Sequence, residues 1–290
     1  MRNTDKLNRL VLWMKARNDA ESTIANYSHH LKVFFTWADE DSCRISEKKI
    51  QDYVLQIPAS FSFSYKNQAI NAIKLYFKII ENKDLDYITV PRPKDYQFIP
   101  NILTESQVER VIFNTKNIKH QAILFTIYHN GLRVSELLNL TLMDFRTKSE
   151  PPHVIIRGAK HHSTRTIQLS KRCVELVREY FKIYHPKKYL FEGDKEFTQY
   201  TETSIRNVLN NALKRESISL RIRVHDLRHS FATHCLARGM NIYHLSKILG
   251  HKSVQTTEKY YAHLNFSQIQ ICRPDFSNQN IECAEMRIAI

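Results

Sequence analysis

The sequence lacks a long apolar run, a secretory leader and paired cysteines. No stretch approaches the roughly 18 consecutive apolar residues that a membrane-spanning helix needs. The N-terminus, MRNTDKLNRL, has no apolar segment of the kind found in signal peptides, so we expect a cytoplasmic protein. The cysteines are odd in number, scattered and never spaced as CxxC, which argues against a disulfide framework and against a zinc site. They are Cys43, Cys173, Cys235, Cys272 and Cys283.

What the sequence does contain is a globular composition with a large excess of basic residues. Its 290 residues suffice for two ordinary domains or one large one, and a hydrophobic share of 42% is too high for a disordered chain. Residues 1–90 hold 13 basic and 11 acidic residues, which leaves 30 basic and 18 acidic ones for residues 91–290. A basic surface of this size suits a polyanion such as a nucleic acid.

The first 90 residues carry apolar side chains at helical spacing in four consecutive segments. The stripes lie within residues 7–14, 24–35, 50–57 and 69–80. Four amphipathic helices predict a small bundle whose core is formed by these stripes. Lys66 and Lys74 on the last segment have two interpretations, either contacts to phosphates or a solvated basic face.

A proline-bearing stretch separates this bundle from the rest of the chain. Pro91, Pro93 and Pro100 interrupt a segment without helical periodicity, and each proline fixes φ and removes a hydrogen-bond donor. We therefore place a helical domain at residues 1–90, an extended linker at 91–103 and a second domain at 104–290.

The second domain is predicted to be mainly α with a small antiparallel β-sheet, an α+β fold. Residues 104–107 show a capping-box pattern, and residues 123–128 predict a helix at the centre of the core. Residues 153–169 are rich in β-branched side chains and predict a hairpin with Lys160 at its tip. That lysine is either simply exposed or delivers a proton or a phosphate contact into a groove.

Two further groups of polar residues stand out in this domain. Arg133 and Glu136 are three residues apart on a predicted helix, a spacing that usually marks a surface salt bridge. Residues 224–264 combine histidines, an arginine and a tyrosine pair with two short apolar helical patterns, and packing alone does not explain that mixture.

These motifs, in this order, resemble those of the tyrosine recombinases, the family of phage integrases and Xer-type site-specific recombinases. They are GLRVSEL around Arg133, the hairpin Lys160 followed by Arg165, HDLRHSFATH with His225 and Arg228, and LGHKSVQTTEKYY with His251 and Tyr260. The resemblance covers nearly all of the chain. It implies a SAM-like helical domain that binds core DNA, a proline-bearing linker, and a catalytic domain whose C-terminal tail contacts a neighbouring subunit.

The resemblance also implies an activity, the breaking and rejoining of DNA strands by transesterification. Tyr260 would attack the phosphodiester and form a 3′-phosphotyrosyl bond, which stores the energy of the broken bond so that no ATP is needed. Arg133 and Arg228 would bind the non-bridging oxygens, because guanidinium groups stay charged and offer paired donors.

The remaining catalytic roles that the resemblance implies fall to basic side chains. His225 would act as the base, His251 as a hydrogen-bond donor to the phosphate, and Lys160 as the acid for the leaving oxygen. Glu136 would orient an arginine or a histidine. Additional DNA contacts are expected from Lys66, Lys74, Arg165, Arg221 and Arg223.

The expected partners are double-stranded DNA with a specific site and further copies of the chain. Four subunits would assemble on two DNA sites, with a monomer or dimer in the absence of DNA. No metal, cofactor or membrane is expected. Because the bundle begins almost at Met1, we expect no additional arm-binding module. Integration, excision, inversion and dimer resolution remain open, with mobile-element integrases among the candidates.

The sequence departs from the family pattern at two places and leaves two alternatives. The hairpin reads GAKHHSTR, with little glycine, so His161 or His162 could share the role of the lysine. Tyr261 follows Tyr260, and two adjacent helical side chains point about 100° apart, so only one can face a phosphate. The alternatives are a catalytically silent DNA-binding relative and a metallohydrolase built on the four-residue spacing of His225 and His229.

Overall fold

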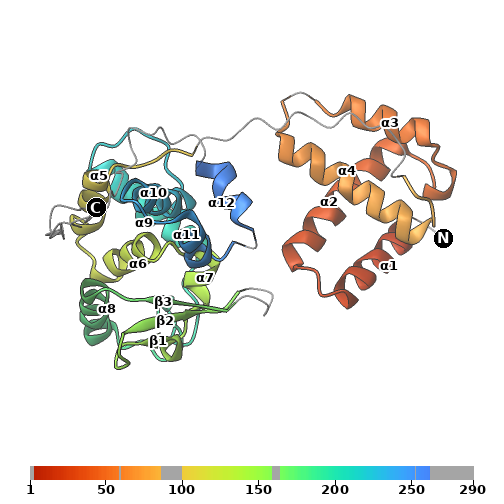
Figure 1. The fold of residues 1–290 in the computed structure, drawn as a ribbon. Helices are drawn as coiled ribbons and strands as arrows, with labels where there is room; N and C mark the ends of the chain where they lie inside the picture. Colours follow the sequence, from red (N-terminus) through yellow and green to blue (C-terminus); the bar gives the residue numbers. More distant parts are fainter. Residues whose placement is uncertain (1–2, 59, 86–99, 159–163, 252, 262–290) are drawn as a thin grey trace, which may run out of the picture. The chain divides into compact units, whose positions relative to one another are not determined.

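The computed structural model describes residues 3–58, 60–85, 100–158, 164–251 and 253–261, and for residues 259–261 only the backbone. The chain divides into two compact units, residues 1–97 and 98–290, each drawn in Figure 1. The linker predicted at 91–103 falls mostly outside the described residues. Within the described ranges, no helix is both long enough and apolar enough to cross a membrane.

Unit 1 is the predicted helical bundle. Its elements are α1 (Asn3–Ala16), α2 (Glu21–Ala38), the 3-10 turn η1 (Ser42–Arg44), α3 (Glu47–Gln56) and α4 (Phe63–Ile80). Ser46 and Ser62 cap α3 and α4 by accepting hydrogen bonds from backbone N–H groups of the first turn. The core contains the aromatic side chains of Phe34, Tyr76 and Phe77, each fully buried. The apolar stripes of the sequence therefore form one core, as predicted.

Unit 2 has the predicted mainly α architecture with a small sheet. Its helices are α5 (Glu105–Phe113), α6 (Ile118–His129), α7 (Val134–Asn139), the 3-10 turn η2 (Leu142–Asp144), α8 (Lys171–Tyr184), α9 (Glu202–Arg215), α10 (Val224–Ala237), α11 (Ile242–Leu249) and α12 (Val254–Tyr261). Its strands are β1 (Phe145–Arg146), β2 (His153–Ile156) and β3 (Arg165–Gln168).

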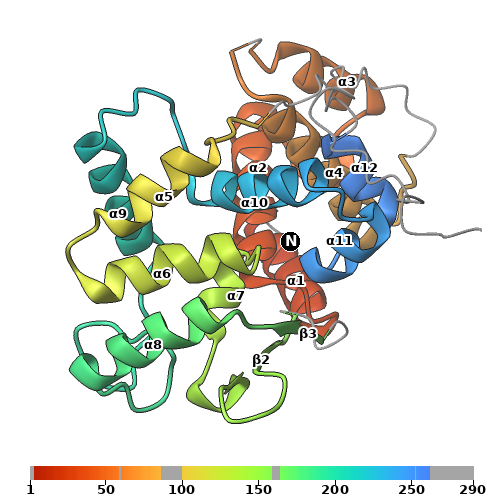
Figure 2. The ribbon, with the colours of Figure 1, turned by 60° about the vertical axis from the view of Figure 1, so that its left-hand side comes forward.

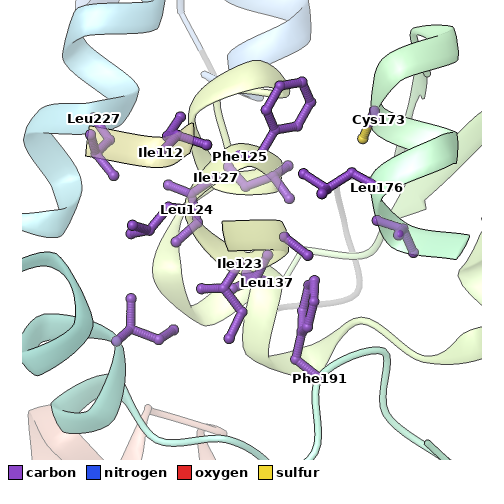
Figure 3. Close-up of a cluster of buried hydrophobic side chains, with 14 of the residues drawn as sticks. Ile112, Ile123, Leu124, Phe125, Ile127, Leu137, Cys173, Leu176, Phe191 and Leu227 are labelled. Atoms are coloured by element: carbon purple, nitrogen blue, oxygen red, sulfur yellow. The ribbon is translucent and has the colours of Figure 1, made fainter. Parts of the chain in front are cut away.

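Helix α6 lies at the centre of the core of unit 2, as predicted. Its side chains are buried on nearly every face, the pattern expected of a helix surrounded by other elements. Figure 3 shows Ile123, Leu124 and Ile127 of this helix among side chains from α10, such as Leu227, and from α8, such as Leu176. The core therefore fixes α6, and with it the loop that leads into α7.

The sheet is antiparallel with the strand order β1-β2-β3. The predicted hairpin is present as β2 and β3, with Ile156 opposite Arg165. β1 is an addition that the sequence did not reveal, because a two-residue strand shows no periodicity. Figure 2 shows α10 beside α6 and followed by α11 and α12. β3 also packs against α11, and Arg165, the first residue of β3, donates a hydrogen bond to the carbonyl of Ile248 near the end of α11.

Candidate active site

The candidate site is built around the start of α7, which follows a left-handed turn after α6. Gly131 has a φ of 59°, and a Cβ atom there would lie 2.6 Å from a ring carbon of Phe231. The turn therefore requires glycine. Arg133 is the N-cap residue of α7, and its backbone N–H and its guanidinium each donate a hydrogen bond of 2.8 Å to Glu136. This carboxylate occupies the N3 position of a capping box.

Glu136 is a buried carboxylate with three guanidinium groups around it. Arg165 donates two hydrogen bonds of 2.8 Å to its two oxygens, and Arg228 Nη1 lies 3.7 Å from Oε2. Burial alone would raise the pKa of Glu136, but the hydrogen bonds and charge of Arg165, together with Arg133, outweigh burial and lower the pKa to about 2. The cluster thus holds one negative and three positive charges at neutral pH.

The same arginines bind the carbonyl groups at the C-terminus of α11. Arg165 Nε donates to the carbonyl of Ile248 at 2.6 Å, and Arg228 Nη2 donates to the carbonyl of Leu249 at 2.7 Å. Arg133 Nη1 makes a longer bond of 3.3 Å to Leu249. The last carbonyl groups of a helix lack partners within it and carry partial negative charge, so cations are favoured there. The arginines thereby join α7, β3, α10 and α11.

Gly250 ends α11 with a φ of 66°. A Cβ atom at this position would lie 2.7 Å from Nη1 of Arg165, closer than any side chain permits. The glycine therefore allows the turn and the approach of the arginine at the same time. The turn therefore fixes the position of the next residue, His251, relative to the arginine cluster.

Arg228 and His251 are in direct contact within this cluster. Arg228 is only 2% exposed; its Nη1 donates to the carbonyl of Gly131 at 2.9 Å, and its Nη2 lies 3.0 Å from His251 Nε2. His251 Nδ1 lies 2.7 Å from Oγ1 of Thr257 on α12. Burial first, and then the charges of the arginines, lower the pKa of His251 to about 4. His251 is therefore neutral at neutral pH.

His225 lies in the first turn of α10 and is exposed to solvent in part. Desolvation by the surrounding protein and the charges of Arg228 and Arg133 lower its pKa below 6.5. Its ring contacts that of His229 edge to face, with 4.8 Å between the centroids, and burial lowers the pKa of His229 to about 4. Across the residues that the structure describes, no group of three His, Cys, Asp or Glu side chains is placed to hold a metal ion.

The structure brings together most of the residues that the resemblance singled out. Arg133, Glu136, Arg228 and His251 share the cluster, and His225 lies near it. Arg133 and Glu136 are no surface salt bridge, because the Glu136 side chain is 6% exposed.

Some of the residues singled out from the sequence fall wholly or partly outside the described part of the chain. Lys160 lies outside it, as do His161 and His162 beside it. Tyr260 and Tyr261 are described only as backbone positions in α12.

The predicted DNA-contact residues occupy different surroundings. Arg165 is engaged by Glu136 and by the carbonyl of Ile248, so a DNA contact by this residue remains a prediction. Arg221 and Arg223 are exposed at the start of α10, where Arg223 also pairs with Asp226 at 3.1 Å. Lys66 and Lys74 are half-buried on α4 in the other unit.

A hollow of about 790 Å³ adjoins the cluster and includes residues that sequence reasoning missed. It is lined by Arg133 and His225, by Arg206 and Asn210 of α9, and by Arg221. Arg206 and Asn210 are four residues apart on the exposed face of α9, which is the signal that could have revealed them. Thr257 was missed because a threonine within a helix has no distinctive pattern.

Comparison with known proteins gives a consistent family. Residues 101–268 match the phage integrase family. The tyrosine recombinase XerA of Pyrococcus horikoshii is 31% identical over 261 residues, which span 89% of this chain and 89% of that protein.

Solved structures of recombinases have a similar fold. The crystal structure of XerA recombinase is 27% identical, covers 91% of this chain and 95% of its own, and has a TM-score of 0.54. The XerH site-specific recombinase bound to its difH substrate is 20% identical, covers 90% of this chain and 81% of its own, and has a TM-score of 0.69, a likeness of fold. With the family match extending over more than half of its length, the chain belongs to the phage integrase family of tyrosine recombinases.

Proposed function

We propose that this protein is a site-specific DNA recombinase that cuts and rejoins strands through a 3′-phosphotyrosyl intermediate. The observation that carries the proposal is the excess of positive charge in the buried cluster, where three guanidinium groups surround one carboxylate. The cluster adjoins α12, the helix with Tyr260, through the bond from His251 to Thr257. A phosphodiester supplies the negative charge that this arrangement lacks.

The reaction starts with attack by Tyr260 on the scissile phosphorus. The phenolic oxygen forms a P–O bond as the bond to the 5′-oxygen breaks, and the phenolic proton goes to His225, whose lowered pKa keeps it neutral and able to accept it. Lys160 protonates the departing 5′-oxygen. Religation to a second DNA end reverses these transfers, so the cycle consumes no ATP.

The charge that develops on the non-bridging oxygens is stabilised by donors of the cluster. Arg133 and Arg228 bind these oxygens, and His251 donates a further hydrogen bond. Glu136 holds Arg133 and Arg165 in place, so its role is to position rather than to react. The proposed chemistry uses only side chains of this protein and names no metal or cofactor.

The DNA would run along the hollow that adjoins the cluster. Arg206, Arg221 and Arg223 line it and are exposed, so they suit contacts to successive phosphates. Asn210 in the same hollow can both donate and accept hydrogen bonds at a base edge. XerH, which has the same fold, has been solved on its difH substrate. Lys66 and Lys74 of unit 1 would add contacts, and cellular DNA as the substrate would place the protein in the cytoplasm.

We further propose a tetramer on two DNA sites. A second hollow of unit 2, about 890 Å³, is lined mainly by α10 and the loop after it, including Phe231, Cys235 and Met240. Residues 262–290 contain apolar side chains and follow directly after α12, so this tail from a neighbouring subunit is the proposed occupant. Exchange of tails would hold the subunits together and link their activities.

Covalent capture tests the proposed function. Wild-type, Tyr260→Phe and Tyr261→Phe proteins are incubated with fragmented DNA of the source organism and EDTA and denatured, and the DNA that remains attached is sequenced. We expect wild type and Tyr261→Phe to retain the same discrete sites and Tyr260→Phe to retain none. If no protein retains DNA although all three bind it, the catalytically silent relative becomes the better account.

A further inference from the structure

His251 is held between two partners of different chemistry. Nη2 of Arg228 lies 3.0 Å from its Nε2, and Oγ1 of Thr257 lies 2.7 Å from its Nδ1. Thr257 is fully buried in α12, and Arg228 is 2% exposed. Both ring nitrogens are therefore engaged within the protein in the absence of DNA.

The identity of these partners fixes the tautomer of His251. A guanidinium has only donors, so Nε2 must be the acceptor and carry no proton. The proton of the neutral ring is then on Nδ1, and the Thr257 hydroxyl accepts the hydrogen bond that Nδ1–H donates. The low pKa of His251, about 4, which follows from burial and from the charges of Arg228, Arg133 and Arg165, agrees with a neutral ring.

This tautomer is the wrong one for the role proposed for His251 in catalysis. Donation to a phosphate through Nε2, which faces the arginines, needs the proton on Nε2. With the proton there, Nδ1 becomes an acceptor, and its partner must donate. A hydroxyl can serve in both states, because it is both donor and acceptor.

We propose that Thr257 is a positioning residue that keeps its hydrogen bond to His251 while the ring changes tautomer, as an entering phosphate takes the place of His251 on Arg228. The inference rests on the proposed function. In the free protein the hydroxyl accepts from Nδ1–H; with DNA it donates to Nδ1, and Nε2–H donates to the phosphate. No proton is gained or lost overall, because one moves from Nδ1 to Nε2 through solvent or the phosphate.

The same hydroxyl connects phosphate binding to the helix of the nucleophile. Thr257 and Tyr260 are three residues apart in α12, so their positions are neighbours on one face of the helix. α12 packs against α11, which ends at the arginine cluster. An intact bond from Thr257 to His251 in both states would keep α12 in register with the phosphate throughout the reaction.

The test separates the hydroxyl from the shape of the side chain. Thr257→Val keeps the branched shape and removes the hydroxyl, and Thr257→Ser keeps the hydroxyl. We expect the rate of covalent capture to fall by about 10- to 100-fold in Thr257→Val, the effect of one lost buried hydrogen bond, and to stay within a few-fold of wild type in Thr257→Ser. Equal losses in both variants, or none in Thr257→Val, would overturn the inference.

Nitrogen-15 NMR of the histidine rings reports the tautomer of His251 directly. A purely structural role of Thr257 predicts no change of that tautomer when DNA binds. With the His251 signals assigned by comparison with His251→Asn, we expect Nδ1–H in the free protein. In Tyr260→Phe bound to a duplex with a captured site, we expect Nε2–H. The same tautomer in both samples, or a doubly protonated ring with DNA, contradicts the proposal. If wild-type protein captures no DNA, the proposed function fails as well; if it captures DNA at the same rate as Thr257→Val, only this inference fails.

Discussion

Among the described residues, each unit of the protein contains an ionic cluster around a largely buried charge, Lys6 in unit 1 and Glu136 in unit 2, and the two clusters have opposite composition. In unit 1, Lys6 pairs with Asp41 at 2.7 Å and with Glu81 at 3.1 Å, and the hydroxyls of Ser42 and Tyr76 complete the group. In unit 2, one carboxylate is surrounded by three guanidinium groups. The first cluster has one cation and two anions, and the second has one anion and three cations.

This difference separates a cluster that joins segments of one core from a cluster whose charge suits the binding of an anion. The Lys6 cluster ties α1 to the end of α4 and to the turn between α2 and α3, segments of one core. The Glu136 cluster gathers like charges, which is unfavourable unless a negative group arrives. Burial of charge is common to both; only the unbalanced cluster points to a ligand.

The largest expected effect comes from removing the carboxylate of the unbalanced cluster. Glu136→Ala leaves buried guanidinium groups without their counter-charge, so the free energy of unfolding of unit 2 should fall by about 3–5 kcal/mol. Both tryptophans, Trp13 and Trp37, lie in unit 1. Tryptophan fluorescence therefore follows urea unfolding of unit 1, whereas far-UV circular dichroism follows both units.

The matched variant in the other cluster is Glu81→Ala. It should lower the fluorescence midpoint, and by less, because Asp41 still pairs with Lys6. Glu136→Ala should leave that midpoint unchanged and shift only the remaining circular dichroism. A shift of both signals by either variant would show that the two clusters are not independent.

The next largest expected effect is that mild acid destabilises unit 2 more than unit 1. Burial lowers the pKa of six described histidines in unit 2 and of one, His30, in unit 1; the six are His120, His129, His225, His229, His234 and His251. The unfolded chain binds protons at these groups near pH 6.5, while the folded protein binds them only at lower pH. The contribution of these neutral histidines to the free energy of unfolding is therefore complete above about pH 6.5 and is lost as the pH falls toward about 4.

The expected outcome is a larger decrease in the urea midpoint of unit 2 than of unit 1 between pH 7.5 and pH 5. Replacing His229 and His251 by Gln should reduce that decrease, because two of the lowered pKa values, each about 4, are removed. Equal decreases in both units would contradict the assignment of the acid sensitivity to these histidines.

Short-range features of the fold followed from the sequence, and the cluster did not. The capping box of Thr104 and Gln107 has both of its hydrogen bonds, since its partners are three residues apart. The stripes of both units form cores for the same reason, because helical spacing is local. In contrast, Arg165 reaches Glu136 across 29 residues, and no spacing predicts that pair.

The family resemblance indicated some of the long-range neighbours in the cluster that local sequence patterns could not indicate. It brought together Arg133, Arg228 and His251, which the structure places in one cluster. It assigned Arg165 to DNA, whereas the described contacts of Arg165 are with Glu136 and the end of α11. The sequence did not indicate Thr257 at all. Its contact with His251 depends on the turn at Gly250 that ends α11, and no pattern of residue spacing reveals that turn's geometry.

The turn at Gly250 allows a smaller perturbation of the unbalanced cluster. Gly250→Ala forces a side chain into left-handed backbone and against Arg165, which should cost about 1–3 kcal/mol and slow covalent capture. His185→Val is the control, because its φ of 46° is also positive but it ends α8, outside both hollows. Urea midpoints measure the strain that both variants share, and capture rates measure the displacement of Arg165. Equal loss of capture in the two variants would show that backbone strain alone matters.

The smallest expected effect compares the basic surfaces of the two units. Arg206→Ala removes one of the proposed phosphate contacts in the hollow of unit 2, so the slope of log K against log salt concentration for binding to a captured site should decrease by about 1. Lys182→Ala on α8 changes the net charge equally but lies outside that hollow, and should leave the slope unchanged. The same salt dependence measured for Lys66→Ala tests unit 1, where the net charge of residues 1–90 is only +2. A decrease like that of Arg206→Ala would mean that unit 1 contacts the DNA backbone through individual lysines despite its near-neutral charge. No decrease would mean that the electrostatic part of binding comes from unit 2, which contains the arginine cluster proposed to bind the phosphate.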